Sequence, residues 1–193
     1  MLKKVLISSK EKPYITIVNL FSGNRENSLT RTLRDRRGSS VRDIYLGGSM
    51  DPCNKWRDEI AIPALKKNGL TYFNPQTSTE AMALYSRRLL PIEAGAMDNS
   101  RVLLFVILGN SLSVKAMCEA AYHIGLGRSI VLCIEKMPDQ LIVGGEALSP
   151  DALKDYNRGR AYLSDIANRE AVPIFDNIEE SVACVIHKCK AVA

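Results

Sequence analysis

One carboxylate, Glu119, interrupts the apolar side of a helix predicted over residues 114–126. An unbroken apolar run, residues 102–108, precedes this helix, and such a run is typical of a strand covered on both faces. Open α/β sheets bind ligands beyond the carboxyl ends of their strands, and the backbone dipole tolerates a carboxylate in the first turns of a helix. Glu119 is therefore a candidate catalytic residue, and a surface glutamate near a helix start is the equally good alternative.

Two further carboxylates, Glu93 and Asp98, precede the same apolar strand. Paired carboxylates can divide into nucleophile and acid in glycosidic chemistry, and Glu93 could approach Glu119 across a pocket. We therefore take Glu93 as a second candidate catalytic residue and Asp98 as a candidate substrate-binding residue. An exposed helix charge is the alternative for each, and for Asp98 it is the more common case.

A turn made of Gly47, Gly48 and Ser49 follows the predicted strand 43–47. Its glycines let the backbone approach a ligand closely, and its amides could meet an anion. Neither the GxGxxG fingerprint of dinucleotide-binding proteins nor the Lys-Ser/Thr of a P-loop is present. The alternative is that the glycines serve only the conformation of a tight turn.

Strands and helices alternate five times, which predicts a doubly wound, five-stranded parallel sheet of the flavodoxin-like or Rossmann-like kind. The expected strand order is 2-1-3-4-5, so a pocket at the switch point would be lined by the Gly47–Gly48–Ser49 turn, Asn74, the 110–113 loop and Glu119. The predicted strands are 43–47, 71–73, 102–108, 129–134 and 172–175; the predicted helices are 56–67, 80–97 with a break near Pro91, 114–126, 151–168 and 178–190. Residues 137–150 are predicted to be a loop.

Residues 1–41 are predicted to form a separate N-terminal part, a hairpin or edge strand followed by a basic, mobile segment, ahead of an α/β domain over residues 42–193. No aromatic residues interleave with the arginines of the basic segment, so nothing there would stack on bases. A solvated loop explains the charge better, and we do not expect a nucleic-acid partner. These arginines are Arg25, Arg31, Arg34, Arg36, Arg37 and Arg42.

The composition is that of an ordinary globular protein: 193 residues, 46% hydrophobic, 24% charged, with a net charge of +5. No apolar run reaches the roughly 18 residues of a membrane span, and no stretch resembles a secretory signal. The five cysteines include no CxxC pair and there are only two histidines. These features predict a cytoplasmic protein with reduced thiols and without a structural metal site.

The order of these motifs resembles the nucleoside 2-deoxyribosyltransferase superfamily over residues 42–136, and more narrowly the deoxyribosyltransferase-like domains of animal proteins. The order is a strand ending in GGS, a helix bearing Trp56, a strand ending in FNP, a helix, the apolar strand and a loop. The most specific part is the segment that begins at Glu119, EAAYHIGLGR.

The resemblance implies that Glu119 attacks the anomeric carbon of a nucleoside or nucleotide and forms a covalent sugar ester. A second base or water then resolves this ester with retention. The resemblance also implies a homo-oligomer and a reaction that uses no cofactor and no metal. It carries the remaining site residues over as follows: Tyr45, Gly47, Gly48 and Ser49 against base and sugar, Glu93 near the base, and Asn74 lining the pocket.

One position departs from the family pattern. Active members usually carry an aspartate in the loop before the nucleophile, where it binds sugar hydroxyls, whereas this loop reads NSLSVK over residues 110–115. Asn110 or Ser113 could hydrogen-bond a sugar without bringing a charge, and Lys115 could pair with Glu119 or with a phosphate. A catalytically inactive nucleotide-binding or scaffold domain that retains the fold is therefore the alternative function.

Overall fold

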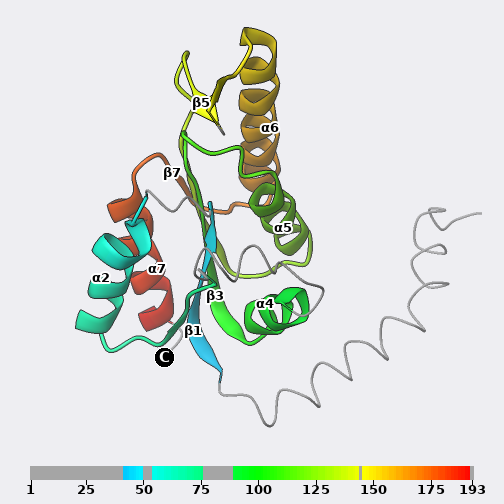
Figure 1. The fold of residues 1–193 in the computed structure, drawn as a ribbon. Coiled ribbons are helices and arrows are strands. Elements are labelled where there is room, and N and C mark those ends of the chain that lie inside the picture. The colour runs from blue at the N-terminus through cyan, green and yellow to red at the C-terminus, as the bar shows by residue number, and fades with distance from the viewer. Residues whose placement is uncertain (1–40, 50–53, 76–88, 144, 192–193) are drawn as a thin grey trace, which may run out of the picture. The chain divides into compact units, whose positions relative to one another are not determined.

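A five-stranded parallel sheet forms the centre of the computed structural model, which describes residues 41–49, 54–75, 89–143 and 145–191 (Figure 1). The strand order is β2-β1-β3-β4-β7, with every neighbouring pair parallel. This confirms the predicted fold class and the predicted order. The strands are β1 (Arg42–Gly48), β2 (Tyr72–Phe73), β3 (Ser100–Ile107), β4 (Ile130–Ile134) and β7 (Ile174–Phe175).

Helices cover both faces of the sheet (Figure 1). One face carries η1 (Arg57–Ala61), which is a π-helical turn, α2 (Ile62–Lys67) and α7 (Ile178–Ala191). The other carries α4 (Leu89–Asp98), α5 (Val114–Gly125) and α6 (Pro150–Arg169).

Strand β3 supplies side chains to both layers, which explains why its sequence is apolar without interruption from Val102 to Ile107. Val102, Leu104 and Val106 belong to the core beneath α2 and α7. Their neighbours Leu103, Phe105 and Ile107 belong to the core beneath α4, α5 and α6. Successive strand residues point to opposite faces, so the part of a strand that is covered on both sides has apolar residues at every position.

The helix ends follow local sequence signals. The side chain of Ser149 caps α6 by accepting a hydrogen bond from the Ala152 N–H at 3.2 Å, with Pro150 at the first helical position. Gly127 adopts a positive φ of 67° just after α5, as expected for a glycine that stops a helix.

One sequence prediction needs correction. The predicted loop 137–150 contains an antiparallel hairpin of β5 (Ile142–Val143) and β6 (Glu146–Ala147), which was missed because strands of two residues leave no recognisable alternation. The predicted break near Pro91 lies at the edge of the described residues: α4 runs from Leu89 to Asp98, and the part of the predicted helix before residue 89 is outside them.

Several other predictions fall outside the described residues: the N-terminal hairpin and basic segment, and the first half of the predicted helix 80–97. In the part of the chain that the structure describes, no helix has the length and apolar character to cross a membrane.

The end of β1 approaches β3 so closely that only glycine fits at position 48. Gly48 has a φ of +117°, and a Cβ there would lie 2.1 Å from the carbonyl oxygen of Val106. Gly125 in α5 has no heavy atom within 4 Å of such a Cβ.

We expect Gly48→Ala to lower the free energy of unfolding by at least about 2 kcal/mol, because it combines backbone strain with a steric clash. Gly125→Ala, the matched control, should be neutral or should stabilise by up to about 1 kcal/mol. Urea unfolding of both variants measures the difference. Equal stability of the two would contradict the close approach of the strands.

Candidate active site

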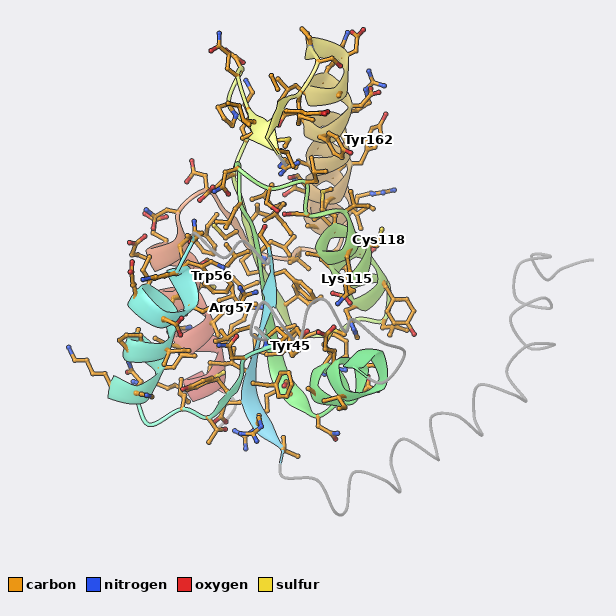
Figure 2. The ribbon with its side chains drawn as sticks, viewed as in Figure 1. Tyr45, Trp56, Arg57, Lys115, Cys118 and Tyr162 are labelled. Carbon is orange, nitrogen blue, oxygen red and sulfur yellow. The ribbon has the colours of Figure 1, made fainter. Side chains whose placement is uncertain are left out.

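A pocket of about 300 Å³ lies beside the carboxyl ends of β1 and β3. Strand β1 and its end contribute an aromatic ring, a glycine and a serine, while α4 and the start of α5 contribute the charged groups. Figure 2 shows Tyr45 and Lys115 on this side of the sheet and Trp56 on the other. The lining residues are Tyr45, Gly48, Ser49, Pro75, Glu93, Ser111, Ser113, Val114, Lys115, Ala116 and Glu119.

Two carboxylates meet one ammonium group in this pocket. The Nζ of Lys115 lies 2.5 Å from Oε2 of Glu93 and 3.6 Å from Oε1 of Glu119. Lys115 and Glu119 are one turn apart on α5, whereas Glu93 comes from α4. Glu93 is only 5% exposed, so it is not a solvated helix charge.

The surroundings of Glu119 act on its pKa in opposite directions. Partial burial raises this pKa above its ordinary value because the carboxylate loses water. The charge of Lys115 lowers it, and the negative charge of Glu93 raises it further. The lysine therefore favours the ionised form of Glu119, which is the form able to act as a nucleophile.

Ser49 and Ser113 connect the end of β1 to the start of α5 through a short hydrogen bond between their hydroxyl groups. Ser113 holds a left-handed backbone with φ of 53°, and its side chain does not cap the helix. On the opposite face of the sheet, Nη1 of the buried Arg57 donates to the Ser49 carbonyl at 2.9 Å. Arg57 also stacks over the ring of Trp56, 4.3 Å from its centroid.

Tyr45 is 2% exposed and stacks on Phe73, with 5.7 Å between ring centroids. Together with Pro75 it gives the pocket an apolar wall.

Gly47 is buried but does not line the pocket, and a Cβ there would lie 2.7 Å from the Phe105 ring. Its small size therefore serves packing between β1 and β3.

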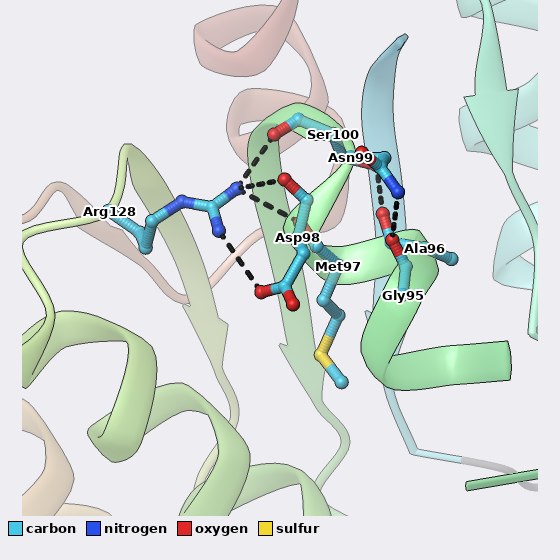
Figure 3. A network of polar contacts seen from close by, with 7 residues as sticks. All are labelled: Gly95, Ala96, Met97, Asp98, Asn99, Ser100 and Arg128. Carbon is cyan, nitrogen blue, oxygen red and sulfur yellow. Dashed lines mark hydrogen bonds and ion pairs between the residues drawn. The ribbon is translucent and has the colours of Figure 1, made fainter. Parts of the chain in front are cut away.

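Besides Gly47, three more of the candidate substrate-binding residues do not line the pocket: Asn74, Asp98 and Asn110. Asp98 ends α4 just before β3 begins, so it lies at the amino end of β3, whereas the pocket lies at the carboxyl end. Figure 3 shows the cluster to which it belongs: Arg128 donates to the carbonyls of Met97 and Ser100 at 2.9 and 2.8 Å and forms an ion pair with Asp98 at 3.7 Å.

Among the described residues, no group of three or more His, Cys, Asp and Glu side chains is placed to hold a metal ion. Four of the pocket residues were not singled out from the sequence: Pro75, Ser111, Val114 and Ala116. Lys115 was expected to pair with Glu119 or with a phosphate, and it does pair with Glu119. Ser111 does belong to the 110–113 loop that was expected at the pocket, so topology located it although its residue type did not.

Residues 41–137 match the sequence profile of nucleoside 2-deoxyribosyltransferase-like proteins, which is half of the chain. The chain belongs to this family. A comparison with curated proteins found no match. The family match includes every residue that lines the pocket and confirms the resemblance seen in the sequence.

This deoxyribosyltransferase-like pocket also depends on a residue beyond the match, Arg160 on α6. Arg160 is 3% exposed, and its guanidinium donates to the carbonyls of Leu108 at 3.0 Å, Ser111 at 2.5 Å and Glu135 at 3.1 Å. A side chain in the middle of a helix gives no sequence signal for such long-range contacts.

We expect Arg160→Met to lower the free energy of unfolding by about 3 kcal/mol, because the buried carbonyls lose a charged donor. Arg158→Met on the same helix is the control. Arg158 is half exposed and pairs with Asp155 at 3.2 Å, so its loss should cost less than about 0.5 kcal/mol. Chemical denaturation compares the two, and similar losses would contradict a structural role for Arg160.

Proposed function

We propose that the protein cleaves the N-glycosidic bond of a nucleoside or nucleotide, as a 2-deoxyribosyltransferase or an N-glycosidase, with Glu119 as nucleophile. The observation that carries this proposal is the Glu93–Lys115–Glu119 arrangement in the pocket of a deoxyribosyltransferase-like domain. It provides a carboxylate whose pKa is raised by partial burial and whose ionised form a neighbouring cation favours.

In the proposed reaction an oxygen of Glu119 bonds to the anomeric carbon while the bond from that carbon to the base breaks. The base leaves with the electron pair of that bond and is protonated. Water or a second base then attacks the anomeric carbon, and the Glu119 carboxylate is released. Two inversions give overall retention of configuration. Tyr45 and Pro75 offer an apolar wall against which a planar base can lie.

A second candidate function is nucleotide binding without chemistry. It is favoured by the serine-containing loop, which brings no carboxylate, and by the ion pair that occupies Glu119. The two candidates differ in a single result: only the enzyme releases free base on incubation with deoxynucleosides or deoxynucleotides.

Glu119→Gln should reduce base release at least about a thousand-fold, because a neutral amide is a poor nucleophile at the anomeric carbon. The variant should still fold and should still gain thermal stability from the ligand that stabilises the wild type. Glu59→Gln is the control, since Glu59 is an exposed glutamate on η1. Unchanged turnover in Glu119→Gln would rule out the proposed nucleophile.

Lys115→Met should move the acid limb of the kcat/KM profile to higher pH. Loss of the cation raises the pKa of Glu119 further, so the nucleophilic carboxylate forms only in less acidic solution. Lys115→Arg keeps the charge and should leave the limb nearly in place. A limb that stays fixed or moves to lower pH in Lys115→Met would show that Lys115 does not control the ionisation of Glu119.

A further inference from the structure

His123, in the last turn of α5, is the only buried histidine among the described residues. It is 4% exposed, and its Nδ1 atom has no hydrogen-bond partner. The imidazole meets the neighbouring Tyr122 ring edge-on, with 5.2 Å between the ring centroids. Both ring nitrogens of a protonated histidine are donors, so the protonated form would bury an Nδ1–H group without an acceptor.

Two charged groups act on the His123 ring, Arg128 and Asp98. Arg128 follows the turn that ends α5, and its backbone N–H donates to the His123 carbonyl at 3.1 Å. Asp98 is the last residue of α4 and forms the ion pair with Arg128. The ring is therefore within electrostatic reach of an ion pair that joins α4 to the segment after α5.

The Arg128 clamp, by which we mean the contacts of Arg128 with Met97, Asp98 and Ser100, fastens the carboxyl end of α4 (Figure 3). One turn before Met97, Glu93 joins α4 to α5 through its ion pair with Lys115. Both contacts tie the same face of the molecule together. A displacement of the carboxyl end of α4 is thus transmitted to Glu93 within a single helical turn.

A positive charge on His123 conflicts with the Arg128 clamp. Burial lowers the pKa of His123 because the charged ring loses water, the cation of Arg128 lowers it further, and Asp98 offsets part of the effect. The folded arrangement therefore favours the neutral ring. A ring protonated in this place would repel the guanidinium and compete with it for Asp98, and opening of the clamp relieves both effects.

We propose that protonation of His123 is an acid switch that releases the carboxyl end of α4 from Arg128 and so separates Glu93 from Lys115. The open form binds the proton more strongly than the closed form does, because its ring is in contact with water. The closed form is therefore fully favoured above about pH 6.5, the ordinary value for histidine. It is lost as the pH falls through the lowered pKa of the buried ring.

The test measures amide hydrogen exchange of α4 at about pH 7.5 and about pH 5, on either side of the ordinary histidine value, with correction for the intrinsic rates. Protection of α4 in the wild type should fall at least about tenfold in acid, since one pKa unit corresponds to a factor of ten in the opening equilibrium. His123→Gln carries no titrating ring, and its α4 protection should agree within about twofold at the two pH values.

His187→Gln is the matched control, because His187 is the other histidine of the chain and is exposed on α7. This variant should lose α4 protection in acid as the wild type does. Arg128→Gln is the second variant in case His123→Gln does not fold. It removes the cation that the protonated ring repels, so its α4 protection should be lower at both pH values and nearly independent of pH.

The proposal is overturned if wild-type α4 keeps its protection in acid, or if His123→Gln loses protection to the same extent as the wild type. An equal loss in α7, on the opposite face of the sheet, would mean acid unfolding of the whole domain and would overturn it as well. None of these measurements uses a nucleoside, so the switch can be present in a protein that releases no base, and absent from one that does.

Discussion

At Leu108 the central strand leaves the sheet, and its buried backbone groups need partners other than a neighbouring strand. The N–H of Leu108 finds Oγ of Ser49, its carbonyl finds Arg160, and the N–H of Gly109 finds the Glu135 side chain. Buried amide groups are costly to leave unpaired, so these side chains are required for folding whatever the pocket binds. The polar floor of the pocket is thus a consequence of how β3 ends.

The buried carboxylates of the pocket also need a partner of opposite charge. Glu93 is almost fully buried and Glu119 is largely shielded, and two carboxylates so close to each other would repel. Lys115 compensates both because it contacts each of them, and its place one turn before Glu119 follows from the helical repeat. The same ion pair that permits the burial also adjusts the ionisation of the proposed nucleophile, so stability and reactivity depend on one side chain.

The sequence allowed the sheet, its strand order and the neighbourhood of Glu119 to be predicted, because apolar runs and helix signals are local. Asp98 was grouped with the site because, like Glu93, it precedes the central strand. In the structure it is the last residue of α4, pairs with Arg128 and does not line the pocket, whereas Glu93 does. The hydrogen bonds among Ser49, Ser111 and Ser113 and the contacts of Arg160 were not predicted, since they depend on which loops meet after folding. Residue type alone does not distinguish a serine in a hydrogen-bonded chain from one in a solvated turn.

The contacts of Arg160 also bear on the extent of the functional unit. The family match ends at residue 137, and every pocket-lining residue lies within it, but the guanidinium that holds the Leu108 and Ser111 carbonyls comes from α6. Residues 41–137 alone would leave those carbonyls without their charged donor and Ser111 without a fixed position. The position of the 108–113 loop beside the pocket therefore depends on α6, which lies outside the family match.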